Sequence, residues 1–366
     1  MISRSHRALA LLATLFVFAS ASAQEKTAAT PPAVAPTASD LVMLTATIQD
    51  RKGRHLRGLT QKQFTVFEGK QPLEIKYFSN RDEPLSLGIV LDRSGSMSER
   101  IGSSLSKAAL KDGLLRFMLM SNEANVYFFG GFNVNAQLFA DWTYDSNVFA
   151  AALNKVEQMP TKRLTALNDA FAAALEKVSQ GPNSKRVLLF FSDGRQDNAS
   201  LTKHKDLRRM IQQTDVLIYA VVFVDRSALD VDGQVKLDEL TSDSGGKAYF
   251  VVNEKELEQA LTLIAAELRS QYRFGFIPVN SKRAGKWIEV KLKIDHQITS
   301  KTVCTCVAAA VIFHPRTGPD KVNANFPAGA AQARSVRRPL PVSKGHCSRI
   351  LCMLRQLRHD VAICRA

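Results

Sequence analysis

The stretch Leu85-Ser-Leu-Gly-Ile-Val-Leu-Asp92-Arg-Ser-Gly-Ser96 decides the fold. Its first part, residues 85–91, is a largely apolar run, which is typical of a central parallel strand buried on both faces. A carboxylate and two hydroxyls follow at alternate positions, Asp92, Ser94 and Ser96, with Gly95 allowing a tight loop between them. A strand that ends in closely spaced oxygen donors predicts a ligand site at the carboxyl edge of a parallel sheet.

Strands and helices alternate on both sides of this stretch, from residue 84 to 275. Further strands are expected at 125–132, 136–142, 186–192, 216–222 and 245–251. Helices are expected at 105–120, 149–156, 166–178, 203–213, 235–243 and 255–272. In the first helix, helical spacing predicts an inner face of Leu105, Ala108, Ala109, Leu115 and Met118. The alternation predicts the α/β class, with a Rossmann-like, open, mostly parallel sheet and helices on both faces.

The segments outside this body have strand patterns instead. We expect strands at 41–48, 64–68 and 73–78 before it, and at 272–278 and 287–294 after it. In the first strand, alternate residues form one buried face, Val42, Leu44, Ala46 and Ile48. Three strands alone make a marginal sheet. We therefore predict one small β module built from both flanks, residues 40–83 and 276–295.

A second acid stands in the same structural position as Asp92. Asp193, in Ser192-Asp193-Gly194, also follows a buried strand, and Thr165 lies at the start of an expected helix between the two acids. Carboxylates and hydroxyls are hard oxygen ligands, which suit Mg²⁺, Mn²⁺ or Ca²⁺ better than zinc or copper. The sequence therefore predicts a divalent-metal site at this sheet edge.

The ordered pattern Asp92-x-Ser94-x-Ser96, Thr165 and Asp193-Gly194 resembles the metal-ion-dependent adhesion site of von Willebrand factor type A domains. The resemblance covers residues 84–275. The flanks, residues 59–70 and 272–278, are similar to a secreted bacterial subgroup, the von Willebrand factor A-related proteins of Acidobacteria.

This resemblance implies a role for each of the five residues. Ser94, Ser96 and Thr165 would be hydroxyl ligands, and Asp92 and Asp193 would hold the ion directly or through water. The open position would accept a Glu or Asp from a partner protein, so the resemblance implies metal-dependent adhesion or scaffolding and not catalysis. The family often has Gly-Gly before the Thr. Here Arg163-Leu164 makes that loop stiffer and more basic, and Arg163 is a candidate contact for an acidic partner.

The same residues allow two other interpretations. Asp92, Ser94 and Ser96 could be a capping cluster ahead of the helix at 105–120, but that would not explain Thr165 and Asp193. An enzyme with a serine nucleophile needs a nearby base, and none of the histidines follows a strand end near Ser94. Gly-x-Ser-x-Gly and P-loop motifs are absent. A metal-dependent hydrolase that uses the same five residues is the alternative function.

The amino-terminal residues indicate export. Residues 1–23 have a basic start, a short apolar core and Ala-Ser-Ala at the end, as in a secretory signal peptide. An uncleaved anchor is the alternative, although the apolar run is short for a membrane span. Residues 24–39 are expected to be an Ala/Thr/Pro-rich linker. We therefore expect a periplasmic or extracellular protein without a transmembrane segment after cleavage.

The strong positive charge belongs largely to the tail. Of the formal net charge of +15, the segment 301–366 contributes eleven Lys/Arg against two Asp/Glu, and all five cysteines also lie beyond residue 300. This segment has few aromatic residues and no nucleic-acid-binding motif, so we expect no nucleic-acid partner. Cys304-x-Cys306 is too closely spaced for the usual zinc pair. We expect residues 296–366 to be an atypical, disordered tail.

Overall fold

The computed structural model describes residues 41–50, 52–103, 106–158, 162, 164–195, 199–224, 231–279 and 290–295. The expected signal peptide, linker and tail lie outside these residues, and so does Arg163. No helix in the described part of the chain is long and apolar enough to cross a membrane.

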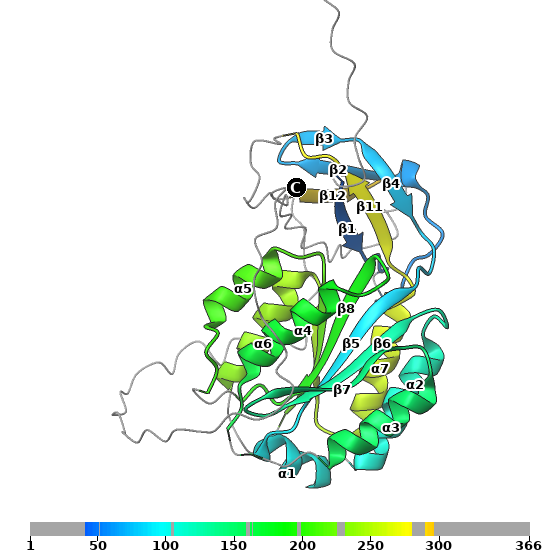
Figure 1. Ribbon diagram of the computed structural model, residues 1–366. Coiled ribbons are helices and arrows are strands. Elements are labelled where there is room, and N and C mark those ends of the chain that lie inside the picture. Colours follow the sequence, from blue (N-terminus) through cyan, green and yellow to red (C-terminus); the bar gives the residue numbers. More distant parts are fainter. Residues whose placement is uncertain are drawn as a thin grey trace, which may run out of the picture. The chain divides into compact units, whose positions relative to one another are not determined.

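Six of the described strands form the central sheet: β5 (Leu85–Asp92), β6 (Val126–Phe132), β7 (Ala136–Thr143), β8 (Lys185–Ser192), β9 (Leu217–Phe223) and β10 (Lys247–Val251). Their order is β10-β9-β8-β5-β6-β7, and all neighbours are parallel except β6 and β7 (Figure 1). Every residue of β5, β8 and β9 is buried apart from Arg186, which is half-buried. These are the strands that the continuous apolar runs predicted.

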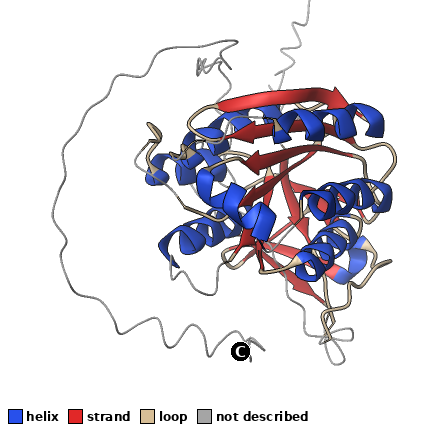
Figure 2. Ribbon diagram, turned by 90° about the horizontal axis from the view of Figure 1, so that it is seen from below, coloured by secondary structure: helices blue, strands red, loops and turns tan. Residues whose placement is uncertain are grey.

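Helices cover both faces of this sheet (Figure 2). One face packs against α2 (Lys107–Met120), α3 (Ser146–Glu157) and α7 (Glu254–Leu268) in one hydrophobic cluster. The other packs against α4 (Leu167–Ser179), α5 (His204–Gln212) and α6 (Val231–Ser244) in a second cluster. The predicted α/β architecture, with a mostly parallel sheet between helical layers, is confirmed.

The flanking segments form two small sheets. One has the order β1 (Val42–Ala46), β11 (Tyr272–Phe276), β4 (Ile75–Ser79), and the other β12 (Val290–Ile294), β2 (Phe64–Glu68), β3 (Gln71–Leu73). The short 3₁₀ helix η2 (Gln61–Gln63) precedes β2. Strands from before and after the α/β body pair directly, β1 with β11 and β2 with β12, both antiparallel. A shared apolar cluster includes the predicted inner face of β1.

Three details of the secondary structure differ from the prediction. The prediction of a single strand at 73–78 is wrong. Strand β3 ends at Leu73 and β4 begins at Ile75, and the two strands belong to different small sheets. The helix expected at 255–272 is too long, since α7 ends at Leu268 and Tyr272 begins β11. A short helix that the sequence did not predict, α1 (Gly95–Ser103), follows β5.

The predicted inner face of α2 is also largely wrong. The buried side chains are Leu110, Leu114, Phe117 and Met118. Of the predicted residues only Met118 is among them, while Ala109 and Leu115 are half-buried, Ala108 is exposed, and Leu105 lies outside the described residues. Apolar residues occupy most positions of this helix, so its spacing alone allows two stripes, and packing against α7 selects one.

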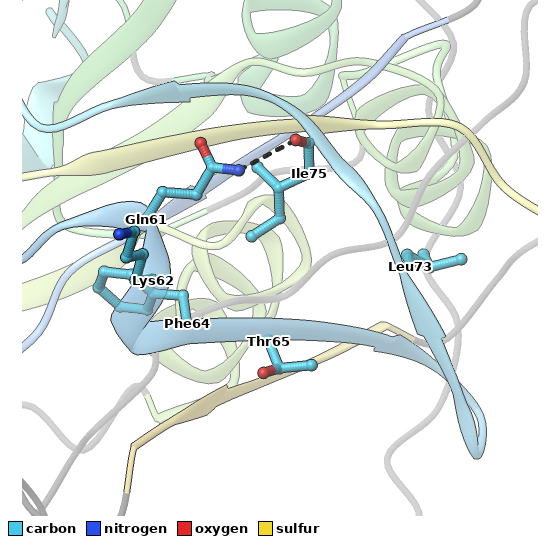
Figure 3. A pocket seen from close by; sticks show the side chains of 6 residues that line it. All are labelled: Gln61, Lys62, Phe64, Thr65, Leu73 and Ile75. Carbon is cyan, nitrogen blue, oxygen red and sulfur yellow. Dashed lines mark hydrogen bonds between the residues drawn. The ribbon is translucent and has the colours of Figure 1, made fainter.

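A hollow of about 490 Å³ lies in the small sheets (Figure 3). Its lining residues are Gln61, Lys62, Phe64, Thr65, Leu73 and Ile75. The Gln61 side-chain amide donates to the Ile75 carbonyl at 3.2 Å across it. The lining contains no carboxylate and no histidine, so it does not have the chemistry of a metal site.

Candidate metal site

Asp92 ends β5 in a fully buried position, with 0% of its surface exposed. The Ser192 hydroxyl, from the end of β8, donates to Asp92 Oδ2 at 2.7 Å. The Ser94 backbone N–H donates to Oδ1 at 2.8 Å. Both oxygens of the carboxylate are thus held by hydrogen bonds from the ends of two adjacent strands.

Ser94 and Ser96 lie where β5 gives way to α1. Their hydroxyl oxygens are 3.2 Å apart, and Ser94 is buried. The Ser94 carbonyl accepts from the Ser98 N–H at 3.0 Å, so Ser94 stands at the head of the new helix. Ser94 therefore lies directly before α1, and its backbone carbonyl accepts a hydrogen bond from the first turn of that helix.

Asp193 follows β8 and is almost fully buried. Its Oδ1 accepts from the Arg195 backbone N–H at 3.0 Å, and Arg195 Nε lies 4.0 Å from Oδ2. Gly194 has φ of +78°, and a Cβ there would lie 2.7 Å from the carbonyl carbon of Gly233 in α6. Glycine is required because this backbone turn is left-handed and presses against another backbone.

Thr165 lies just before α4 and is 1% exposed. The segment that leads to it runs beside the Ser94 loop. Lys162 forms a parallel bridge with Ser94, and its carbonyl accepts from the Gly95 N–H at 2.9 Å. The residue after Thr165, Ala166, donates its N–H at 2.8 Å to the Asn133 carbonyl, just past β6. Loops that follow three neighbouring strands therefore meet at this edge.

Burial and a neighbouring acid both perturb the carboxyl group of Asp92. Burial, and then the nearby charge of Asp193, raise the pKa of Asp92 to about 7. The hydrogen bonds from Ser192 and Ser94 act in the opposite direction and do not compensate fully. Two neighbouring buried carboxylates and the hydroxyls of Ser94 and Ser96 are donors of the kind that a hard divalent cation takes, and Thr165 lies on the loop next to them.

The residues predicted for the site are thus found at one edge of the sheet, with Arg163 outside the described part. No group of three or more His, Cys, Asp or Glu side chains with metal-binding geometry occurs in that part. Any ion held here would therefore rely on hydroxyls for much of its protein coordination. Ser192 is a residue of the site that the sequence reasoning missed. Its only signal was its place beside Asp193 at a strand end.

A family model described as the von Willebrand factor type A domain matches residues 87–196. That range includes all five predicted ligands. The chain contains a von Willebrand factor type A domain. The family model does not extend to the flanks, so the predicted resemblance of the flanks to a secreted bacterial subgroup stays a prediction. No curated protein matches the chain by sequence.

The solved structures that are similar to this chain are distant from it in sequence. A von Willebrand factor type A protein from Catenulispora acidiphila is 12% identical, with a TM-score of 0.42 over 66% of this chain and 74% of its own. The conserved hypothetical protein BatB from Bacteroides thetaiotaomicron is 16% identical, with a TM-score of 0.39 over 50% of this chain and 98% of its own. The PilB minor pilin from Streptococcus sanguinis is 12% identical, with a TM-score of 0.43, and the match spans 51% of this chain and 62% of the pilin.

Proposed function

We propose that this protein is an exported, divalent-metal-dependent protein-binding module that acts in adhesion or scaffolding. Asp92, Ser94, Ser96, Thr165 and Asp193 would hold Mg²⁺, Mn²⁺ or Ca²⁺ at the carboxyl edge of the sheet. When bound, the ion would supply a positive centre with an open position for a carboxylate of the partner. Domains of this type are generally interaction modules.

The observation that carries the proposal is the pair of buried carboxylates, Asp92 and Asp193, which lie at the ends of adjacent parallel strands next to the Ser94 loop. A divalent cation would offset the repulsion between these two carboxylates. Because the remaining donors are neutral hydroxyls, the ion would retain enough positive charge to attract an acidic group. Binding to the partner should therefore depend on metal and fail when a chelator is present.

The described histidines favour binding over hydrolysis. His55 pairs with Gln49 at 3.0 Å in the small sheets, and His204 pairs with Glu239 at 3.1 Å between α5 and α6. Each imidazole is bonded to one of these side chains, and neither hydrogen bond involves a candidate ligand. We therefore assign neither histidine the role of general base in the alternative hydrolase. Arg163 remains a proposed contact for the acidic partner. The periplasmic or extracellular location rests on the signal-peptide pattern of residues 1–23.

Calorimetric titration with Mg²⁺ tests the metal site directly. Ser94→Ala should weaken binding by tenfold or more, because it removes one hydroxyl ligand and leaves the loop intact. Ser86→Ala is the matched control. Ser86 is a buried serine on the same strand that accepts from the Asn183 N–H at 2.9 Å, at the other end of the sheet. Equal Mg²⁺ affinity in wild type and Ser94→Ala would contradict the proposed site.

A pull-down from envelope extract, with and without chelator, then tests the function. A partner should be retained by wild type and by Ser86→Ala only in the presence of metal, and should be lost with Ser94→Ala. Retention in every arm would refute metal-dependent recognition.

A further inference from the structure

Two large apolar side chains project into solvent beside the candidate metal site. Leu164, directly before Thr165, is 52% exposed, and Leu201, eight residues after Asp193, is 92% exposed. Leucine normally loses such exposure on folding, because burying it removes apolar surface from water. An exposed leucine whose backbone is fixed by hydrogen bonds is therefore a candidate contact for a partner.

Hydrogen bonds bring the two leucines to the same region. The Asn168 backbone N–H donates to the Ser200 hydroxyl at 3.2 Å, and the Asn168 side-chain amide donates to the Thr202 carbonyl at 3.0 Å. The segment 200–202 thus lies against the first turn of α4. Leu164 is only three residues ahead of that helix. Both leucines therefore flank the segment that carries Thr165.

The backbone of Leu201 is fixed in this exposed position. Asp169 accepts from the Leu201 N–H at 2.8 Å through Oδ2 and from the Thr202 N–H at 2.7 Å through Oδ1. A carboxylate that accepts two backbone N–H groups makes a strong, directional clamp. Because the backbone is already fixed, a partner that covers Leu201 has to order only its side chain.

Exposed lysines lie on the segments next to the two leucines, and the one acid beside Lys205, Asp206, forms an ion pair with Arg209 at 3.5 Å. Lys162, beside Ser94, is exposed. Lys203 and Lys205, at the start of α5, are exposed as well. An apolar patch with basic side chains around it complements a segment that is both apolar and acidic.

We propose that Leu164 and Leu201 form an apolar rim that selects the partner of the metal site. The partner is an extended protein segment in which the acidic residue that reaches the metal is accompanied, within about two residues, by a bulky apolar side chain. That side chain packs against the two leucines while the lysines attract further acidic residues. This inference rests on the function proposed above, because the acidic residue is placed by the metal.

A peptide library with a fixed central Glu and randomised flanks tests the rim. The full chain selects peptides in Mg²⁺, and the selected sequences are read. Wild type should enrich Leu, Ile, Phe or Met near the Glu. The double variant Leu164→Ser/Leu201→Ser should still select Glu peptides in a metal-dependent way but lose that enrichment, and should bind a wild-type-selected peptide about tenfold more weakly.

Leu119→Ser is the matched control. Leu119 is also an exposed leucine, at 82%, and lies near the end of α2. It is not in the segments that carry the five candidate ligands, so its substitution should change nothing. Metal-dependent selection of Glu peptides with unbiased flanks, or enrichment that survives in the double variant, would overturn the rim and leave the metal-dependent function standing. Peptide selection that is insensitive to chelator and to Ser94→Ala, or the absence of any selected peptide, would count against both.

Discussion

At the scale of single residues, the protonation of Asp92 depends on its burial and on the neighbouring carboxylate of Asp193. In water its carboxyl group would ionise near the usual pKa of 3.8, but burial and the charge of Asp193 raise that pKa to about 7. The folded, metal-free protein therefore holds a proton that the unfolded chain releases. Ionising Asp92 in the fold opposes stability, and this opposition is absent below about pH 4, grows between pH 4 and 7, and is complete above pH 7.

Asp92→Asn should consequently have opposite effects on stability and on metal binding. At pH 8 in chelator it should raise the free energy of unfolding by about 1–4 kcal/mol, because it removes a buried charge. At pH 5 the gain should be much smaller. The variant should also lose the rise in Tm that Mg²⁺ gives wild type. Urea unfolding at both pH values measures the first effect, and an equal difference between the proteins at pH 5 and 8 would contradict it.

Lys185 shows the same physics with the opposite charge. Its ammonium group is buried at the start of β8 and donates to the Leu268 carbonyl at 2.5 Å, and burial lowers its pKa from 10.5 to about 8. The folded state therefore disfavours the proton that the unfolded chain keeps. The stability of wild type should rise relative to Lys185→Met between pH 7.5 and 9.5, by about 1–2 kcal/mol in urea unfolding. If the free energies of unfolding of wild type and Lys185→Met changed in parallel with pH, the pKa of Lys185 would not be lowered in the fold.

At the scale of elements, the loop after β8 depends on its contact with α6. A Cβ on Gly194 would lie 2.7 Å from the Gly233 carbonyl carbon, and φ at Gly194 is +78°. Gly194→Ala should therefore lose about 2–4 kcal/mol of stability and weaken Mg²⁺ binding, because the loop that carries Asp193 must move. Gly53 has a similar φ of +74° but nothing within 4 Å of its Cβ position. Gly53→Ala should lose only about 1 kcal/mol and keep its Mg²⁺ affinity. The difference between the two variants then gives the part of the loss that is due to the steric clash with Gly233, beyond the cost of the left-handed backbone.

Some of these elements could be predicted from the sequence alone and others could not. Strands β5, β8 and β9 were predictable because a strand buried on both faces must be apolar throughout. The site at Asp92 and Asp193 followed from the rule that parallel strands end at one edge. Helix α1 was missed because its sequence is mostly polar, and Met97 is its one fully buried apolar side chain among those described. The break at Glu74 was missed because the choice of strand partner depends on residues 200 positions away.

At the scale of the whole molecule, segments from both ends of the described chain are tied to the α/β body by polar contacts. Arg273 of β11 donates to Glu83 at 2.6 Å and to the Ser184 hydroxyl at 3.0 Å, just ahead of β5 and β8. From the amino-terminal side, the Thr47 hydroxyl just after β1 donates at 3.5 Å to the Glu267 carboxylate of α7, which also accepts from the Tyr219 hydroxyl at 2.8 Å. These contacts lie at the amino ends of the parallel strands, and the candidate ligands lie at the carboxyl ends. The anchoring contacts and the candidate ligands thus lie at opposite ends of the parallel strands.

The pairing of β2 with β12 predicts which part of the carboxyl-terminal region the fold requires. A chain that ends at residue 279 would lack β12, so β2 would lose its antiparallel partner and the Val290 side chain would leave the cluster around Val66. We expect this shortened chain to be degraded at least about tenfold faster by protease, because an unpaired strand edge opens readily. A chain that ends at Asp295 keeps β12 and should match the full chain in protease resistance and in Mg²⁺ affinity. Faster degradation of the chain ending at 295 would show that the residues beyond it support the small sheets, contrary to the expectation that they form a disordered tail.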